Sequence, residues 1–241
     1  MKNIIITGIS KGLGLEIAKV LLKKGYSVYG INRSISKELQ QLKEIYKDRL
    51  FIKQFDLSKP DKIKKDLFDN FINLDIPIYG FINNAAIAYD DIITNLNLDP
   101  LKRMYQVNVF SPMMIIKYAI RNMIYYHTPG RIIHISSISV HTGYKGLAMY
   151  ASTKGALEAF SKNTAREWGS RKIHSNCIVA GFMETNMSNN LTEKQKERIY
   201  RRTSLKKATD RVSVAKTVKF LLSDSSLSIT GQKIFVDAGT I

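Results

Sequence analysis

Tyr150 and Lys154 stand four residues apart in the segment Tyr150-Ala151-Ser152-Thr153-Lys154. In a helix this spacing places both side chains on one face, so the lysine ammonium can lie beneath the phenol. A free tyrosine titrates near about pH 10, and a nearby cation lowers that pKa because it favours the phenolate. Tyr150 could then act as a general acid or base at neutral pH. Ser137 precedes this helix and can hydrogen-bond a substrate oxygen as charge develops on it.

A glycine-rich segment follows the first apolar run of the chain and reads Thr7-Gly8-Ile9-Ser10-Lys11-Gly12-Leu13-Gly14. Glycines let the backbone turn tightly and approach a pyrophosphate, whose charge then faces the amino terminus of the next helix. The spacing is G-x-x-x-G-x-G, and the alternative is an ordinary turn between a strand and a helix. The predicted phosphate-binding residues are Gly8, Ser10, Lys11, Gly12, Leu13 and Gly14.

The second apolar run ends in Ile31-Asn32-Arg33-Ser34, without an acidic residue. An acidic residue at this position would hold the ribose hydroxyls of NAD. Asn32, Arg33 and Ser34, together with Lys11, instead offer two cations and a hydroxyl to a 2′-phosphate. The sequence therefore predicts NADP(H) as the cofactor. The alternative for Arg33 is an exposed loop cation without a ligand.

Two further loops follow apolar runs and carry polar or small residues. Asp56-Leu57 supplies a carboxylate that can accept a hydrogen bond from an adenine amino group. Asn83-Asn84-Ala85-Ala86 supplies small residues against which an adenosine can lie. Taken alone each segment is typical of a turn, and Asp56 could simply cap a helix.

Short β-branched runs alternate with longer stretches whose apolar residues are three and four apart. The predicted strands are Ile4-Ile5-Ile6, Ser27-Val28-Tyr29-Gly30-Ile31, Leu50-Phe51-Ile52-Lys53, Ile78-Tyr79-Gly80-Phe81-Ile82, Arg131-Ile132-Ile133-His134-Ile135, Asn176-Cys177-Ile178-Val179 and Lys233-Ile234-Phe235-Val236. Near-continuous apolar strands between helices indicate a parallel sheet covered on both faces. We therefore predict one α/β domain over residues 1–241, a Rossmann-like doubly wound parallel sheet of about seven strands. In such sheets ligands bind beyond the carboxyl ends of the strands.

The composition excludes several classes of protein. One cysteine among 241 residues forms no internal disulfide and no thiolate metal cluster. The four histidines show no ligand spacing, so we expect no metal site, and His134 within a predicted strand is expected to be a core or sheet-face residue. No apolar run approaches the length of a membrane span, and the first apolar run enters a turn without a cleavage site. We expect a soluble, cytoplasmic protein.

The chain carries 37 Lys and Arg residues against 20 Asp and Glu, a formal charge of +17. Such a charge is compatible with nucleic acid, an anionic membrane surface, or an acidic substrate or partner. The lysines are scattered along the whole chain, so solvated basic faces are the alternative. We expect no nucleic acid as a partner. We also expect no membrane, since no basic amphipathic helix lies outside the predicted fold.

Taken together in this order, these motifs resemble the short-chain dehydrogenase/reductase family over essentially the whole chain. The resemblance implies a catalytic set of Ser137, Tyr150 and Lys154, with Asn108 as its fourth member. It also implies that Tyr150 and Lys154 contact the cofactor. In the family that asparagine interrupts its helix and holds a water in a proton relay leading to the lysine. The positive nicotinamide ring would add to the effect of Lys154 on the tyrosine pKa.

The resemblance also implies roles for the later part of the chain. Ala180-Gly181-Phe182-Met183-Glu184-Thr185 falls on the segment that holds the nicotinamide carboxamide, with Gly181, Met183 and Thr185 as contacts. The closing strand near Val236 usually packs in a tetramer interface, which implies a homotetramer or a dimer. Ala86 replaces a usual glycine and Ala180 a usual proline, and both changes are small.

Within the family the chain most resembles 3-oxoacyl-acyl-carrier-protein reductases. The basic segment Ser170-Arg171-Lys172 matches a position that contacts the acidic carrier protein. Cations also crowd a predicted lid at residues 185–210, either to attract an anionic substrate or as a solvated face. Sugars, nucleotide-sugars and small ketones or alcohols remain alternative substrates, and His141 and Tyr144 could line their pocket. A remote alternative is a binding protein that senses a dinucleotide without turnover.

Overall fold

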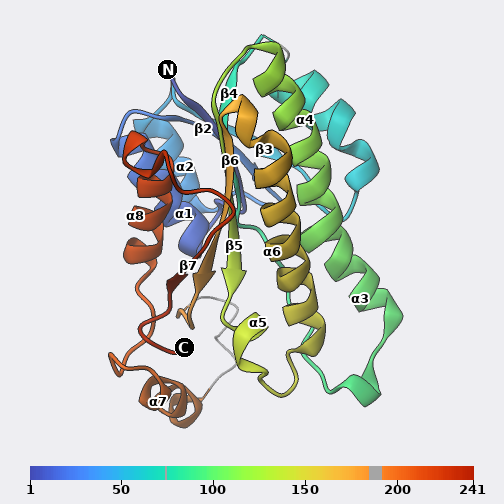
Figure 1. The fold of residues 1–241 in the computed structure, drawn as a ribbon, viewed down its shortest axis with the longest axis vertical. Helices are drawn as coiled ribbons and strands as arrows, with labels where there is room; N and C mark the ends of the chain where they lie inside the picture. The colour runs from blue at the N-terminus through green and yellow to red at the C-terminus, as the bar shows by residue number, and fades with distance from the viewer. Residues whose placement is uncertain (74, 185–191) are drawn as a thin grey trace.

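The computed structural model describes residues 1–73, 75–184 and 192–241. Its centre is a parallel sheet of seven strands in the order β3-β2-β1-β4-β5-β6-β7 (Figure 1). All of the strand pairings are parallel. The strands are β1 (Asn3–Thr7), β2 (Ser27–Asn32), β3 (Leu50–Gln54), β4 (Ile78–Asn83), β5 (Gly130–Ser137), β6 (Ile173–Ala180) and β7 (Lys233–Val236).

Helices connect the strands. The α-helices are α1 (Gly12–Lys23), α2 (Lys37–Ile45), α3 (Leu98–Tyr105), α4 (Ser111–Tyr125), α5 (Ser139–Thr142), α6 (Ala148–Trp168), α7 (Glu193–Arg202) and α8 (Arg211–Leu221). Two π-helical segments, η2 (Lys64–Ile72) and η4 (Gln106–Phe110), lie among them. Short 3₁₀ turns are η1 (Pro60–Lys62), η3 (Ile93–Asn95), η5 (Gly169–Arg171) and η7 (Asp224–Ser226).

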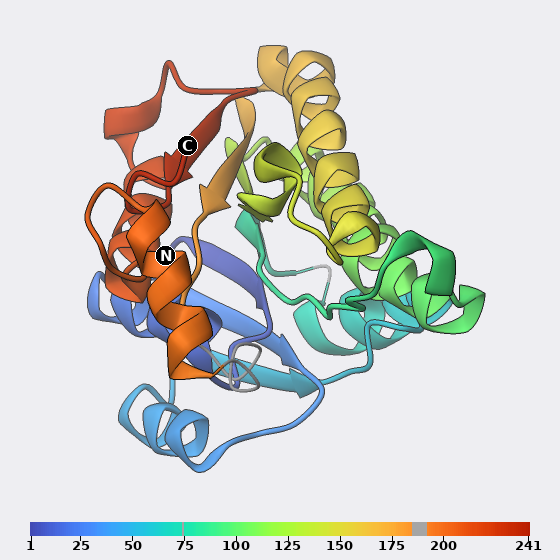
Figure 2. The same cartoon turned by 90° about the horizontal axis from the view of Figure 1, so that it is seen from below.

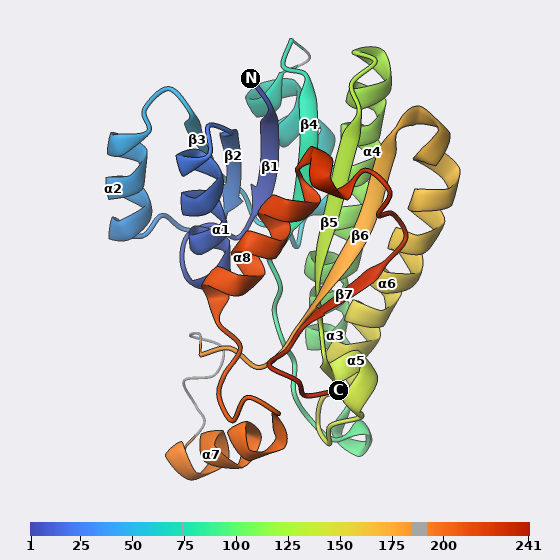
Figure 3. The same cartoon turned by 60° about the vertical axis from the view of Figure 1, so that its left-hand side comes forward.

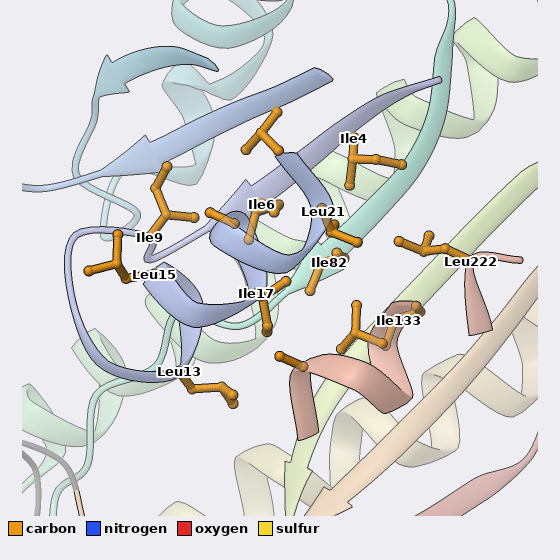
Figure 4. Packing of buried hydrophobic residues seen from close by; sticks show 14 of the residues in the cluster. Ile4, Ile6, Ile9, Leu13, Leu15, Ile17, Leu21, Ile82, Ile133 and Leu222 are labelled. Atoms are coloured by element: carbon orange, nitrogen blue, oxygen red, sulfur yellow. The ribbon is translucent and has the colours of Figure 1, made fainter. Parts of the chain in front are cut away.

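The two faces of the sheet are covered by different helices, because successive side chains of a strand point to opposite faces. Ile4 and Ile6 belong to the core that packs against α1 and α8 (Figure 4). Ile5 belongs to the other core, which contains residues of η2 and α4 and the partly buried Phe160 of α6. Figure 1 shows α1, α2 and α8 on one side of the sheet and α4 and α6 on the other.

All residues of β2 and β4 are buried, as expected for strands with helices on both faces. Each fully buried isoleucine or leucine contributes about 1.5–3 kcal/mol from the removal of its apolar surface from water.

The strand positions and their order in the sheet confirm the predicted fold and all the predicted strands. The main difference is in length: β6 begins at Ile173, ahead of the predicted Asn176.

The strands end at a common edge, where the loops that follow β1, β4 and β5 meet. In Figures 1 and 3 the arrows of β5 and β7 point toward this carboxyl edge, and α5 and α7 lie near or beyond it. None of the helices in the described ranges is long and apolar enough to cross a membrane.

Candidate active site

The glycine loop at the carboxyl end of β1 is tied to the turn that follows β4, and Figure 2 views this edge of the sheet from below. Thr7 Oγ1 accepts hydrogen bonds from the backbone N–H groups of Asn84 at 3.1 Å and Ala85 at 3.0 Å. The Asn84 side-chain amide donates in return to the Thr7 carbonyl at 2.9 Å and the Gly8 carbonyl at 3.2 Å. These bonds fix the start of the loop against the neighbouring strand.

Gly8 and Gly14 show why the loop requires glycine. Gly8 has a φ of +76°, in the left-handed region that residues with a Cβ rarely adopt. A Cβ on Gly14 would lie 2.1 Å from the Gly8 carbonyl oxygen, so the loop can fold back on the first turn of α1 only with glycine there. The first turn of α1 contains no acidic residue, and its N-cap Lys11 makes no side-chain capping bond. This helix terminus fits a pyrophosphate, because free N–H groups and the helix dipole attract anions.

The residues at the end of β2 divide into two groups. Asn32 is 4% exposed, and its Oδ1 accepts a hydrogen bond from the Ile9 backbone N–H at 2.7 Å. It therefore shapes the glycine loop from within, although the sequence grouped it with surface donors. Arg33 and Ser34 are exposed, as is Lys11 on the loop, so these three side chains are accessible to a phosphate.

Ser36 is a loop residue that the sequence analysis missed. Its hydroxyl donates to the Ser10 carbonyl at 2.5 Å and accepts from the Leu39 N–H at 3.1 Å, which caps α2. A serine directly before a helical pattern that carries Glu38 in its first turn is an N-terminal signal that could have revealed it. Ser36 thereby holds the loop after β2 against the glycine loop.

The predicted adenine-site residues lie in the loops after β3 and β4. Asp56 Oδ1 accepts from the Ser58 N–H at 2.9 Å, and this bond holds the pKa of Asp56 below its usual value. Leu57 is buried, and its carbonyl accepts from the Ser111 hydroxyl at 2.5 Å. The turn after β4 contributes Asn83, Asn84, Ala85 and Ala86.

The predicted catalytic pair lies in the first turns of α6. Lys154 is 2% exposed, and its Nζ donates to the Ile135 carbonyl at 2.8 Å. The same Nζ lies 5.7 Å from the centre of the Tyr150 ring. The helix therefore places the ammonium next to the phenol, as the spacing predicts.

Asn108 lies in η4, the π-helical turn between α3 and α4. Its Oδ1 accepts from the Ile87 N–H at 2.9 Å, and its Nδ2 donates to the Ile87 carbonyl at 2.8 Å. The same Nδ2 donates to Thr153 Oγ1 at 3.1 Å. Asn108 thus joins the segment after β4 to α6, one residue away from Lys154. The interrupted helix that the family resemblance implies is present at this position.

Ser137 is the last residue of β5. Its Oγ accepts hydrogen bonds from the Ser139 N–H at 3.2 Å and the Ser139 hydroxyl at 3.0 Å. A serine hydroxyl that accepts these bonds still has its own proton to donate to a substrate oxygen. Ser139 begins α5, a single short helix that the sequence analysis did not predict.

The protonation of Tyr150 differs from the sequence-based expectation. Burial raises the pKa of Tyr150 above its ordinary value, and the negative charge of Asp90 raises it further. Burial also lowers the pKa of Lys154 to about 8. The expectation of a lowered tyrosine pKa considered the lysine cation but not desolvation, which opposes both charged forms. Asp90 was not singled out, since only the fold brings it near Tyr150.

For the alcohol oxidation that the family resemblance implies, Asp90→Asn is expected to shift the pH profile toward lower pH. Tyr150 must lose its proton to act as a base in that direction, and removal of the Asp90 charge lowers its pKa. The measurement is kcat against pH at saturating cofactor. Asp91→Asn is the matched control, because its Oδ1 is already bound to the Ile92 N–H at 2.8 Å. An equal shift in both variants would contradict the assignment to Asp90.

The histidines and the remaining predicted residues lie as follows. His134 is completely buried, with a pKa lowered to about 3 by burial, and is a core residue as predicted. His141 Nε2 lies 3.1 Å from Glu158 Oε1. Among the described residues, no group of acidic, histidine or cysteine side chains is arranged to hold a metal. Gly181 and Met183 follow β6, whereas Thr185 lies outside the described residues.

Comparison with known proteins identifies the family. A family model described as enoyl-(acyl carrier protein) reductase matches residues 8–240. A 3-oxoacyl-[acyl-carrier-protein] reductase of Chlamydia trachomatis serovar D is 33% identical over 241 residues, which cover 99% of this chain and 96% of that protein. The chain belongs to the short-chain dehydrogenase/reductase family.

Solved structures of short-chain dehydrogenases agree with this assignment. A 4-hydroxyisoleucine dehydrogenase complexed with NADH has a TM-score of 0.92 and 25% identity, over 100% of this chain and 98% of that one. ElxO with bound NADP has a TM-score of 0.86 and 26% identity, over 99% of this chain and 98% of that one. As a short-chain dehydrogenase/reductase, this chain is an oxidoreductase that acts on CH–OH or C=O groups.

Proposed function

We propose that this chain is an NADPH-dependent carbonyl reductase whose substrate is a 3-oxoacyl thioester of acyl carrier protein. The observation that carries the reductase proposal is the placement of Lys154 Nζ 5.7 Å from the Tyr150 ring on α6, next to the strand that ends at Ser137. The curated relative that is 33% identical and named a 3-oxoacyl-[acyl-carrier-protein] reductase supports the choice of substrate.

In the proposed reduction, the carbonyl carbon receives the hydride that NADPH would supply when bound. Tyr150 donates its proton to the carbonyl oxygen, and the Ser137 hydroxyl donates a hydrogen bond to the same oxygen. Lys154 lies next to the phenol, and its charge stabilises the phenolate that remains after Tyr150 has given its proton to the substrate. A proton from solvent then restores the phenol. Asn108 is a positioning residue, because its side chain joins the segment at Ile87 to α6.

Exposed cations support the choice of NADP(H) over NAD(H). Arg33 and Lys11 flank the glycine loop, and no carboxylate stands at the end of β2, where one would hold ribose hydroxyls. A planar guanidinium matches a phosphate with two parallel hydrogen bonds. The solved relatives include one complexed with NADH and one with NADP, so the preference must come from this chain's own residues.

Arg33→Asp is expected to reverse the cofactor preference. A hydrogen bond to a charged group contributes about 1.5–3 kcal/mol, so kcat/KM with NADPH should fall about 10- to 100-fold. The value with NADH should rise, because the new carboxylate can accept from the ribose hydroxyls. The measurement is kcat/KM with each cofactor, and Lys47→Asp is the control with the same change of charge in the loop after α2. Unchanged preference in Arg33→Asp would rule out this recognition.

Basic residues support an anionic, carrier-bound substrate. Helix α7 presents several cations near the carboxyl edge, of which Lys196 is paired with Glu193 at 2.7 Å. Arg171 lies in η5 ahead of β6, at the opposite edge of the sheet, and does not add to this group. The other basic residues of α7 are Lys194, Arg198, Arg201 and Arg202. An excess of positive charge attracts an acidic carrier protein and raises its association rate at low ionic strength.

We also propose that the protein is a cytoplasmic homotetramer. Among the described strands, the edge strand β7 pairs with β6 alone, and its Phe235 is 43% exposed. An exposed edge strand with an aromatic side chain is suited to association with a second copy. Light scattering coupled to gel filtration tests the assembly, and a monomer at micromolar concentration would contradict it.

The deciding experiment follows the loss of NADPH absorbance with acetoacetyl thioesters of coenzyme A and of acyl carrier protein. Turnover that is faster on the carrier-protein thioester supports the proposal. Crotonyl thioesters test double-bond reduction, which the description of the matching family model names. If neither thioester reacts while sugars or small ketones do, the acyl-thioester assignment is wrong. If NADPH binds and no substrate turns over, a dinucleotide-sensing protein becomes the better hypothesis.

A further inference from the structure

A cavity of about 650 Å³ lies at the amino ends of the strands, opposite the candidate active site. Its walls come from residues that directly precede the strands: Lys2 before β1, Pro77 before β4, Pro129 before β5 and Lys172 before β6. This is the size of a small-molecule pocket, for which about 300–1,000 Å³ is typical. None of the catalytic or cofactor residues named above lines it.

Arg131 lines the cavity with a charge that the protein does not neutralise. The residue is 3% exposed, and its Nη1 donates to the Gly130 carbonyl at 2.9 Å. Its Nε is buried without an acceptor, and no carboxylate of the described residues lies within 4.0 Å of the guanidinium. A buried donor without a partner costs about 1–3 kcal/mol, and a buried charge without a counterion costs more.

The neighbouring groups maintain this positive potential. Lys2 Nζ lies 4.2 Å and the Arg131 guanidinium 5.8 Å from the centre of the Tyr79 ring, which attracts cations without neutralising them. Asp224 is the acidic residue of the wall and lies 3.8 Å from Lys2, so it compensates that lysine. Lys172 adds a second uncompensated cation at the exposed rim.

His174 also lines the cavity but adds no charge at neutral pH. Burial and the nearby Arg131 lower the pKa of His174, so its imidazole is neutral there. Its Nδ1 lies 3.2 Å from the Ile229 carbonyl. Among the side chains that line the cavity, the uncompensated charges are therefore those of Arg131 and Lys172.

The remaining wall is largely apolar and includes Pro77, Pro129 and Leu227. A ligand that fits both parts has one anionic group and a short apolar body. We propose that this cavity is a second ligand site, which binds a small organic carboxylate with its carboxylate at Arg131 and Lys172. A guanidinium matches a carboxylate in shape and charge, and the apolar body is removed from water against the prolines and leucine. The proposal does not depend on the substrate of the active site.

Isothermal titration with sodium hexanoate at constant ionic strength tests this site. We expect saturable binding of one hexanoate per chain, undiminished by saturating NADPH, and much weaker binding of hexan-1-ol. Lys172→Gln, a change at an exposed residue, should weaken hexanoate at least threefold, and Arg131→Gln should abolish the binding heat. Lys216→Gln, the same loss of charge on an exposed residue of α8, should leave hexanoate binding unchanged.

Several results would overturn the proposal. Equal binding of hexan-1-ol would show that the carboxylate is not recognised, and equal binding of inorganic phosphate would show that the apolar body is not. Displacement of hexanoate by NADPH would place the site at the carboxyl edge of the sheet. Arg131→Gln removes a buried side chain, so if it fails to fold the comparison of Lys172→Gln with Lys216→Gln decides, and equal affinities in these two would reject the site.

Discussion

Tyr150→Phe should lower kcat by about 10²- to 10⁴-fold, the usual contribution of a positioned general acid. The substitution keeps the ring and removes only the hydroxyl that is to donate a proton to the substrate oxygen. Burial raises the pKa of Tyr150, so the wild-type phenol is protonated at neutral pH and is ready to donate in the direction of reduction. The measurement is the steady-state rate of NADPH consumption with acetoacetyl thioester.

The control for this variant is cofactor affinity. Phenylalanine leaves the bonds between Thr7 and the turn after β4 intact, so the dissociation constant for NADPH should change less than threefold. Tyr105→Phe is the matched variant, because it removes a tyrosine hydroxyl that donates to Ser152 Oγ on the same helix at 2.9 Å. Near-normal turnover in Tyr150→Phe would exclude this residue as the proton donor, and an equal loss in Tyr105→Phe would indicate a general disturbance of α6.

Lys154→Met should lower kcat by about 100-fold or more, since the charge next to the phenol is lost. The effect of Lys154→Met on the free energy of unfolding should depend on pH. Burial lowers the pKa of Lys154 from 10.5 to about 8, so the folded state binds this proton less readily than the unfolded state. The buried Lys154 ammonium therefore lowers the free energy of unfolding of the wild-type protein below about pH 8. This destabilisation decreases as the pH rises toward 10.5. Methionine fills a similar volume without that cost.

The readout for Lys154→Met is Tm from pH 7 to pH 10. The difference between variant and wild type should be most favourable to the variant at pH 7 and should decline as the pH rises. Loss of the hydrogen bond to the Ile135 carbonyl lowers the variant's Tm at every pH, so the slope, not the offset, carries the test. A difference that is constant with pH would contradict a depressed lysine pKa in the folded protein.

The strands, the α/β class and the place of the loops could be predicted from the sequence because they depend on local patterns. A window of a few residues is enough to recognise a β-branched run such as Ile4-Ile5-Ile6 or the helical spacing from Tyr150 to Lys154. Interactions between distant segments could not be predicted in this way. The hydrogen bond that the Ile9 N–H donates to Asn32 Oδ1 joins residues 23 positions apart and determines which face of the loop Asn32 occupies.

The same limit applies to charge at the site. The local sequence shows that a lysine able to favour a phenolate stands near Tyr150. The burial of Tyr150 and its proximity to Asp90 depend on how the segment after β4 folds over α6. Desolvation then opposes the lysine and raises the pKa of Tyr150. Ser36 was missed because its bond to Ser10 spans 26 positions, although its capping role is a local signal.

The bonds between Thr7 and the turn at Asn84 and Ala85 join residues 77 and 78 positions apart. During synthesis the glycine loop therefore leaves the ribosome well before the residues that fix it. The proposed pyrophosphate site is complete only after β4 has been made and has paired with β1. A nascent chain that stops short of β4 has the glycines but not the bonds that fix them, so the proposed dinucleotide site cannot form until synthesis has passed Asn83 and the turn that follows it.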